Sequence, residues 1–392
     1  MSKNLLFSVS IAALVGLVAT FSWAQIRTSG QNATPKTASP LIFKTFTPAP
    51  TLQYLPNAAN NMTGWIKVTA GATNGNPTLL PTTNGYFLIG RGGDNAIYGA
   101  PIDIQNPQTI DSTSWKVLVN SYNSGITCNA NRPNSWANTT KWSRCYGLGP
   151  NGSAVVTEFP SNSDGSPGDN QTRNFGGQNA GGLPMGISFD LQFPNARTVS
   201  VITVMADNGL WLHKMVVTAW NSANSPTIQS SWEKIPNQVV GSAASCILVN
   251  PNEVYCAFRS VNNFVRLLTL TGTPSNRVED LLSNTTSWNN SNILNSPPAT
   301  SAANQPLTSA PSIVKHPNNR YSIMIRDFDG SLKRITYNSI NKTWGSWIDE
   351  GGYLNAGSQP TCVADGFVPV CLIQGPDGGA YIKRLPAIVA GL

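Results

Sequence analysis

Residues 326–352, RDFDGSLKRITYNSINKTWGSWIDEGG, contain an Asp-Gly pair, two tryptophans three positions apart and a double glycine. Apolar runs flank the Asp-Gly pair, and Asn and Gly tolerate the positive φ of a type I′ turn, so this stretch predicts a β-hairpin. Equivalent turns occur five more times, at intervals of 48 to 67 residues: Asp94-Asn95, Asn151-Gly152, Asp207-Asn208, Asn262-Asn263 and Asp377-Gly378. The chain is therefore predicted to repeat one hairpin-containing unit six times.

Other residues recur at similar distances from these turns. A tryptophan follows four of the turns by about 20 to 25 residues, at Trp115, Trp232, Trp288 and Trp347, and Phe175 takes this place in the third unit. A proline also precedes the next predicted strand in several units: Pro77, Pro184, Pro311 and Pro360.

The composition agrees with a chain of many short strands. Of its 392 residues, 11% are charged and 40% are hydrophobic, which leaves it poor in helix formers, rich in turn formers and too apolar for disorder. A unit of about 55 residues with four strands is typical of a β-propeller blade. We therefore predict an all-β fold, a single β-propeller of six four-stranded blades over residues 51–392, with seven blades as the alternative.

The sixth unit ends at AYIKRLPAIVAGL, residues 380–392, without a tryptophan segment of its own. The segment TGWIKVTAG, residues 63–71, has the missing pattern around Trp65. We infer that this N-terminal strand completes the last blade, closes the propeller without a covalent bond and protects its sheet edges.

The six cysteines form closely spaced pairs: Cys128 with Cys145, Cys246 with Cys256, and Cys362 with Cys371. Their spacing is not the CxxC of a zinc site, and the chain has only two histidines to assist. Each pair falls across the first hairpin of a unit, the second, fourth and sixth, where facing antiparallel strands suit disulfide geometry. We predict three disulfides, each adding on the order of 2–3 kcal/mol.

The N-terminus predicts export. Lys3, an apolar run over residues 5–21 and the small residues Ser22 and Ala24 indicate a signal peptide, residues 1–24, with an uncleaved anchor as the alternative. Thr, Ser and Pro are frequent in residues 25–50, which predicts a linker. We expect a secreted, extracellular protein, with the periplasm or cell surface as alternatives, because disulfides persist there. No later stretch is expected to span a membrane.

The remaining charged residues give few signals. The net charge of +7 is scattered, which argues against nucleic-acid binding. Asp327 and Asp329 lack the other ligands of a calcium loop, so a hairpin turn is favoured and no metal or cofactor is predicted. His213 lies on an apolar strand and is expected in the core, whereas His316 of KHPNNR is expected in a surface turn.

The repeat resembles that of the PLL-like β-propeller lectins, secreted bacterial proteins that bind fucose and related sugars. Their blades combine an Arg-Gly-x-Asp turn, a Trp-x-x-Trp pair, a Gly-Gly and a Ser-x-Pro, which RGGDNAIYG (91–99) and residues 329–363 match best. The resemblance implies a lectin whose partners are glycans or glycoproteins and whose oligomeric state stays open.

The candidate ligand-binding residues follow from the chemistry of sugars. The C–H face of a sugar packs on an aromatic ring, its hydroxyls need fixed polar partners, and repeated weak sites gain by avidity. The predicted stacking platforms are Trp65, Trp115, Trp232, Trp288 and Trp347. Their predicted polar partners are Arg91, Arg259 and Arg326. The alternative is structural: the tryptophans pack blade on blade, and each arginine pairs with its turn aspartate.

Fungal-type fucose lectins with six blades use an arginine and a glutamate with a stacking aromatic side chain. None of the residues assigned here to the positions that follow the turns is a glutamate. These residues are Tyr98, Trp211, Arg266, Arg334 and Tyr381. A fungal-type site is therefore not expected, and the sugar stays open.

Two other functions remain as alternatives. A propeller glycosidase or sialidase would need paired carboxylates or a Tyr–Glu pair with several arginines at its centre, and nothing in the sequence pairs the carboxylates outside turns, which are Glu158, Asp190, Glu233 and Glu253. Because no carboxylates are paired in this way, we expect a protein that is not an enzyme. The other alternative is a non-catalytic, protein-binding adhesin, which would carry the same repeat.

Overall fold

The computed structural model describes residues 62–69, 73–82, 85–119, 126–128, 142–148, 154–160, 171–174, 185–189, 196–206, 209–218, 228–242, 244–250, 253–261, 264–271, 290–294, 309–327, 329–355 and 357–388. The predicted signal peptide, residues 1–24, and the predicted linker, residues 25–50, lie outside this part of the chain. No helix in the described part has the length and hydropathy of a membrane-spanning segment.

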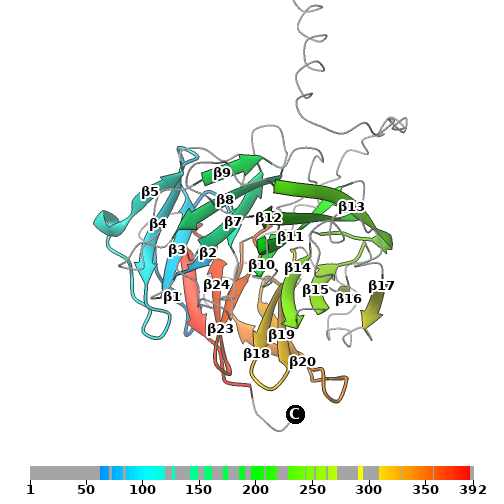
Figure 1. The fold of residues 1–392 in the computed structure, drawn as a ribbon. Helices are drawn as coiled ribbons and strands as arrows, with labels where there is room; N and C mark the ends of the chain where they lie inside the picture. Colours follow the sequence, from blue (N-terminus) through cyan, green and yellow to red (C-terminus); the bar gives the residue numbers. More distant parts are fainter. Residues whose placement is uncertain are drawn as a thin grey trace, which may run out of the picture. The chain divides into compact units, whose positions relative to one another are not determined.

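The described strands form six antiparallel sheets (Figure 1). The first sheet comprises β2 (Thr78–Pro81), β3 (Tyr86–Arg91), β4 (Ile97–Ile102) and β5 (Lys116–Val119). The second comprises β6 (Ile126–Cys128), β7 (Trp142–Leu148), β8 (Ala154–Pro160) and β9 (Gln171–Asn174). The third comprises β10 (Met185–Phe189), β11 (Ala196–Ala206), β12 (Gly209–Thr218) and β13 (Ile228–Val239). One 3-10 turn, η2 (Ser112–Ser114), precedes β5.

The remaining three sheets repeat this plan. The fourth comprises β14 (Ser245–Asn250), β15 (Glu253–Arg259), β16 (Val265–Thr271) and β17 (Asn290–Leu294). The fifth comprises β18 (Ser312–His316), β19 (Arg320–Arg326), β20 (Leu332–Asn338), β21 (Thr343–Trp344) and β22 (Ile348–Gly351), the last two pairing with β20. The sixth comprises β23 (Thr361–Asp365), β24 (Val368–Gln374), β25 (Ala380–Arg384) and β1 (Ile66–Lys67).

The sixth sheet joins the two ends of the described chain. In it β1 pairs with β25, so that Ile66 lies opposite Ile382 and Lys67 lies opposite Tyr381. The backbone N–H of Val68 extends this pairing, since it donates to the carbonyl of Ala380 at 2.9 Å. The segment that begins at Met62 therefore supplies the fourth strand of the last sheet.

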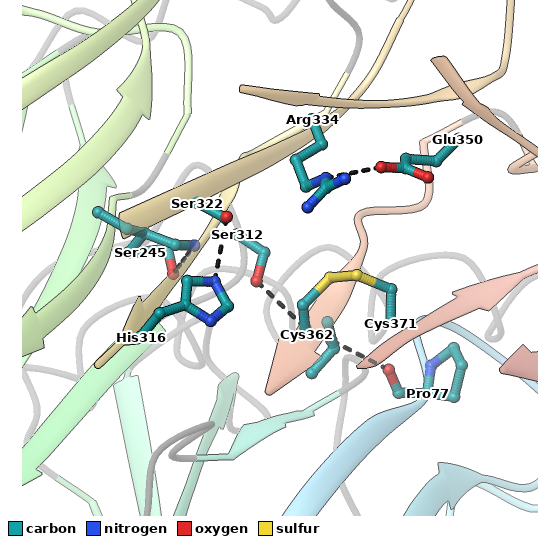
Figure 2. Close-up of a disulfide and its surroundings, with 11 residues drawn as sticks. Pro77, Ser245, Ser312, His316, Ser322, Arg334, Glu350, Cys362 and Cys371 are labelled. Carbon is teal, nitrogen blue, oxygen red and sulfur yellow. Dashed lines mark hydrogen bonds and ion pairs between the residues drawn. A yellow bond between two sulfur atoms is a disulfide. The ribbon is translucent and has the colours of Figure 1, made fainter. Parts of the chain in front are cut away.

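The first strands of the sheets contact one another in chain order, β2 with β6, β6 with β10, β10 with β14, β14 with β18 and β18 with β23, and β23 in turn contacts β2. Hydroxyl side chains at the starts of these strands link neighbouring sheets (Figure 2). The N–H of Cys362 donates to Ser312 Oγ at 3.2 Å, and the N–H of Ile313 donates to Ser245 Oγ at 3.3 Å. Thr361 Oγ1 donates to the carbonyl of Pro77, just before β2, at 3.3 Å.

The predicted prolines mark where these first strands begin. The strands β2, β10, β18 and β23 start at the residues directly after Pro77, Pro184, Pro311 and Pro360, respectively. Proline has no N–H to donate, so a ladder of strand hydrogen bonds begins naturally after it. These predicted strand starts are confirmed.

The three predicted disulfides are also confirmed. Cys128–Cys145 links β6 to β7, Cys246–Cys256 links β14 to β15, and Cys362–Cys371 links β23 to β24. In each sheet the two cysteines lie directly opposite each other on the first and second strands. The disulfides therefore occupy one structural position in alternate sheets.

Three predicted turns, Asn151-Gly152, Asp207-Asn208 and Asn262-Asn263, lie outside the described residues. The other three lie between the second and third strands of their sheets, but their geometry is not type I′. Among the described residues, positive φ occurs once in each of these turns, at Asn95 (69°), Gly330 (86°) and Gly378 (76°). In the first of these turns the N–H of Asn95 donates to Gly92 and that of Gly92 donates to Ala96, and the other two turns repeat this pattern. These are three-residue loops with one left-handed residue, whereas type I′ needs two.

Candidate functional site

The turn aspartates fix the loops between the second and third strands. Asp94 Oδ1 accepts from the N–H of Ala96 at 3.1 Å, Asp329 Oδ1 from that of Ser331 at 2.9 Å, and Asp377 Oδ1 from that of Gly379 at 2.9 Å. Asp and Asn favour such turns because their side chains hydrogen-bond to the backbone two residues on. The DFDG stretch is thus a hairpin turn, as predicted.

Each described turn aspartate also meets the side chain four residues later. Tyr98 Oη donates to Asp94 Oδ2 at 2.7 Å, which, with the N–H of Ala96, holds the pKa of Asp94 below its ordinary value. Tyr381 Oη donates to Asp377 Oδ2 at 3.0 Å. In the fifth sheet the position belongs to Lys333, whose Nζ lies 3.8 Å from Asp329 Oδ2. The assignment of Arg334 to this position is therefore wrong by one residue.

The predicted tryptophan platforms differ in burial. Trp65 is 7% exposed and packs with Val314 and Leu332 of the fifth sheet, which favours a packing role for its ring. Trp115 and Trp347 are half-buried and lie at the edges of two other apolar clusters. Trp232 lies on β13, of which the structure describes the backbone, and Trp288 lies outside the described residues.

The three predicted arginine partners each end the second strand of a sheet, and the described contacts are with the protein itself. Arg326 is 2% exposed and donates from Nε to the carbonyl of Leu354 at 3.0 Å. Arg259 Nη2 donates to the carbonyl of Gly241. Arg91 Nη2 donates to Asn95 Oδ1 at 2.5 Å, within its own turn. Burial lowers the pKa of Arg326 and of Arg259. The described contacts favour structural roles for all three.

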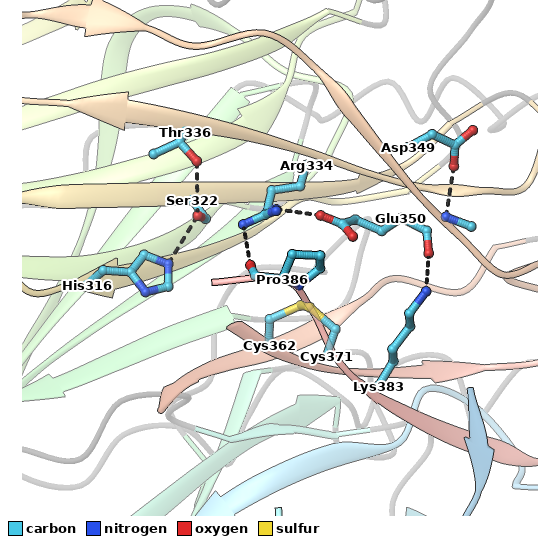
Figure 3. Close-up of polar contacts among 11 residues, drawn as sticks. His316, Ser322, Arg334, Thr336, Asp349, Glu350, Cys362, Cys371, Lys383 and Pro386 are labelled. Carbon is cyan, nitrogen blue, oxygen red and sulfur yellow. Dashed lines mark hydrogen bonds and ion pairs between the residues drawn. A yellow bond between two sulfur atoms is a disulfide. The ribbon is translucent and has the colours of Figure 1, made fainter. Parts of the chain in front are cut away.

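A buried ion pair lies where the fifth sheet faces the sixth (Figure 3). Arg334 Nε on β20 donates to Glu350 Oε1 on β22 at 2.6 Å, and both side chains are 3% exposed. Arg334 Nη1 also donates to the carbonyl of Pro386 at 3.1 Å. Burying two charges is costly even when they are paired, so such a pair is weak support for stability.

The corresponding place in the sixth sheet is apolar. Arg334 lies opposite Ile348, just as Ile382 lies opposite Ile66, so that Arg334 and Ile382 occupy equivalent positions. Two residues after Ile66 comes Val68, which is fully buried, as is Ile382. Two residues after Ile348 comes Glu350, which is the extra residue of a β-bulge between Asp349 and Gly351. Bulges are frequent next to active sites because they re-aim side chains.

The sixth sheet supplies the other side of this place. Lys383 Nζ donates to the carbonyl of Glu350 at 2.7 Å and lies 5.8 Å from the ring centroid of Trp65. The indole N–H of Trp65 is buried without a hydrogen-bond partner, beside Gly352. A buried polar group without a partner is rare enough in native proteins to need an explanation, and a ligand is one. We call Trp65, Arg334, Glu350 and Lys383 the inter-sheet site.

His316 lies beside the inter-sheet site (Figures 2 and 3). Its Nε2 lies 3.0 Å from Ser322 Oγ, and its Nδ1 lies 3.1 Å from the carbonyl of Gly366 in the sixth sheet. Burial lowers the pKa of His316 to about 4; the hydrogen bond to Gly366 opposes this shift and the charge of Arg334 adds to it. His316 is 2% exposed at the end of β18, so the predicted surface turn is wrong. Contact with the neighbouring sheet buries it.

A short C-terminal segment, residues 385–388, covers the inter-sheet site, and we call it the C-terminal strap. The N–H of Leu385 donates to the carbonyl of Pro369 at 2.8 Å, and the N–H of Ile388 donates to that of Phe367 at 2.9 Å. Leu385 and Ile388 are buried, while Pro386 and Ala387 are exposed. The strap thus runs beside the start of β24 with the carbonyl of Pro386 on Arg334.

Glu350, Lys383 and the role of Arg334 were not predicted from the sequence. A signal for part of the site exists, since Arg334 stands where the sixth unit has Ile382. Finding it requires aligning the units by strand register, with one residue allowed for the bulge. The structure also brings Glu350 beside Arg334 from a different strand, a contact that the residues following the turns do not reveal.

Comparisons with known proteins bear on the fold. No protein-family model and no curated protein sequence matches the chain. Among solved structures, the fucose-specific lectin from Aleuria aurantia is 14% identical, with a TM-score of 0.50 over 82% of this chain and 98% of that one. A mutant of AofleA from Arthrobotrys oligospora, with three arginines replaced by alanine, is 11% identical, with a TM-score of 0.50 over 82% and 85%.

A further structure of the Aleuria aurantia lectin, described as a six-bladed β-propeller, is 12% identical, with a TM-score of 0.46 over 82% of this chain and 98% of that one. At such identities a structural likeness bears on the fold alone. The chain is similar in fold to the two lectin structures with a TM-score of 0.50, and it is an all-β protein with β-propeller neighbours.

Proposed function

We propose that the protein is a secreted, multivalent, carbohydrate-binding lectin on a six-bladed β-propeller that β1 closes. The six sheets, the succession of contacts from β2 to β23 and back, and the pairing of β1 with β25 support this ring. The three disulfides agree with an oxidising, extracellular compartment. A structural neighbour is a fucose-specific lectin, which supports fucose-like sugars as ligands.

The observations that carry the proposal are the buried Arg334–Glu350 pair and the unpartnered indole N–H of Trp65. Lys383 links them, since its Nζ donates to the carbonyl of Glu350 at 2.7 Å and lies 5.8 Å from the ring centroid of Trp65. An arginine, a glutamate and an aromatic ring are the set that fungal-type fucose lectins use. Arginine donates to sugar hydroxyls, the carboxylate of Glu350 accepts from them, and charge-assisted hydrogen bonds of this kind are the strong ones. The face of the indole suits the C–H face of a sugar. The inter-sheet site is our first candidate for the sugar.

Additional sites would make the protein multivalent. Trp115 and Trp347 are half-buried at the place in their sheets that Trp65 holds in the sixth, and they keep part of the ring surface accessible. We propose them, with Trp232 and Trp288, as further stacking platforms. Weak copies on one rigid framework would gain affinity by avidity.

A glycan array with the mature protein tests the proposal. We expect binding to a narrow set of fucose-like sugars. The substitution Glu350→Gln should lower the affinity more than tenfold, since it removes a charged acceptor. Asp349→Asn is the matched control: this neighbouring carboxylate is half-exposed and pairs with Lys333 Nζ at 2.6 Å, so its loss should leave the affinity unchanged.

Two results would overturn the proposal. If no glycan binds and fluorogenic glycosides are hydrolysed, the protein is a propeller hydrolase. If it neither binds glycans nor hydrolyses glycosides, the protein-binding function remains. Equal loss of affinity in Glu350→Gln and Asp349→Asn would place the sugar away from the inter-sheet site.

A further inference from the structure

The C-terminal strap holds on to the sixth sheet at two points. Leu385 is 2% exposed and packs with Trp65 and Leu332, and Ile388 is 7% exposed. Each donates one backbone hydrogen bond to the segment 367–369. Between these anchors Pro386, which has no N–H to donate, and Ala387 are exposed. The hold on the strap is therefore local.

The strap takes a contact that a sugar would need. The carbonyl of Pro386 accepts from Arg334 Nη1 at 3.1 Å, where a sugar hydroxyl would accept. Lys383, whose Nζ lies 5.8 Å from the ring centroid of Trp65, is the fourth residue of β25 and is not part of the strap. The donor group of Arg334 is thus occupied by the strap.

The strands of the sixth sheet are also held together by contacts outside the strap. Five residues of β25 pair with β24, and the disulfide Cys362–Cys371 fixes β24 to β23. Segments with few backbone hydrogen bonds open at lower free energy than the strands beside them. The strap can therefore leave while the strands that carry it stay in place.

We propose that the C-terminal strap is an autoinhibitory cover that must leave the inter-sheet site before a sugar binds there. The inference rests on the proposed lectin function. The apparent affinity of a site that is open for only a fraction of the time falls by that fraction. The intact chain therefore binds its sugar more weakly than the open site does, and any partner that detaches the strap strengthens binding.

Three variants test the strap, with methyl α-L-fucoside as the probe in calorimetric titrations. A chain that ends at Arg384 should bind about tenfold more tightly or better than the full chain. Ile388→Asp places a charge on a buried anchor and should have the same effect. Ala387→Asp places the same charge on an exposed residue and should bind as the full chain does. Near-ultraviolet circular dichroism checks that each variant is folded.

Hydrogen exchange on the full chain needs no substitution. The amides of Leu385 and Ile388, protected by their hydrogen bonds, should exchange faster when methyl α-L-fucoside is added, because bound sugar and attached strap exclude each other. Unchanged protection with the sugar bound would overturn the inference, even if the shortened chain failed to fold.

The outcomes separate the two proposals. Equal affinity of the full chain, the shortened chain and Ile388→Asp, or weaker binding after shortening, would overturn the strap and leave the lectin intact. If no folded form of the protein binds any glycan on the array, the lectin function itself is overturned. If Ala387→Asp tightens sugar binding as much as Ile388→Asp does, the effect is due to the added charge, and the proposed autoinhibition by the strap is overturned.

Discussion

Arg334 and Glu350 show how a single pair of positions separates two otherwise similar sheets. The sixth sheet holds the buried Ile382 at the position of Arg334, and its fourth strand has no bulge residue that corresponds to Glu350. A buried ion pair is often no more stabilising than apolar residues of similar volume, whereas one charge left alone is strongly destabilising. Retention of the pair thus needs a reason other than stability, and a ligand supplies one.

The cost of leaving one buried charge alone predicts opposite effects of two substitutions on the free energy of unfolding. Glu350→Val alone should lower the free energy of unfolding by about 3–5 kcal/mol, because it strands the charge of Arg334. Adding Arg334→Ile to it should recover most of that loss, since no buried charge is then left without its partner. Urea unfolding measures both. A double variant as unstable as the single one would mean that the pair is structural.

The lowered pKa of His316 predicts how the free energy of unfolding depends on pH. An unfolded histidine has a pKa near 6.5 and the folded one near 4, so between these values the unfolded chain binds the extra proton. The free energy of unfolding should therefore fall by about 3 kcal/mol as the pH drops from 6.5 to 4. The variant His316→Gln should lose this dependence in urea titrations, while His213 contributes equally to both chains. Identical pH profiles would contradict the shift.

Side-chain chemistry with a local cause could be predicted from the sequence, and chemistry that depends on register could not. The turn aspartates act within five residues of themselves, so Asp94, Asp329 and Asp377 were identifiable from their turns. Glu350 reaches Arg334 across two strands and through a bulge. An alignment that starts from the turn alone misplaces Arg334 into the position of Lys333.

At the scale of elements, the connection from β22 to β23 is fitted closely to the inter-sheet site. Gly352 has a φ of +81°, and a Cβ there would lie 2.5 Å from Trp65 Nε1. Gly357, five residues later, has a φ of +80° but nothing within 4 Å of such an atom. The two glycines share a backbone conformation and differ in what they touch.

Alanine substitutions at these two glycines should therefore separate the two effects. Gly357→Ala should cost about 1 kcal/mol, the penalty of a side chain in the left-handed region. Gly352→Ala should cost about 1–3 kcal/mol more, because the indole must also move. Equal losses in thermal unfolding would show that Trp65 yields without strain.

Strand positions could be predicted more fully than turn geometry. Prolines before β2, β18 and β23 and cysteines across the first hairpins report which residues start and face each other, and both are set by covalent chemistry. Turn type depends on which backbone angles the flanking strands impose, and Asp-Gly suits more than one type. The sequence therefore indicates the hairpins but leaves the loop length open.

At the scale of the whole molecule, β1 is the strand on which the sixth sheet depends. Val68 is fully buried among Val363, Ile382 and their neighbours, whereas Ile66 is 40% exposed. Val68→Asp should lower the free energy of unfolding by about 3–5 kcal/mol, the scale of an uncompensated buried charge. Ile66→Asp, in the same segment, should change it by about 0.5 kcal/mol or less. Similar losses would indicate that β1 is held by its backbone alone.

The pairing of β1 with β25 also sets a timetable for synthesis. Ile66 leaves the ribosome long before its partner Ile382 exists. At about 5–20 residues per second, the 316 residues from Lys67 to Ile382 take roughly 16–63 s to translate. Throughout that interval β1 lacks the strand with which it pairs, and its unpaired edge must be kept from pairing with other chains until β25 is made.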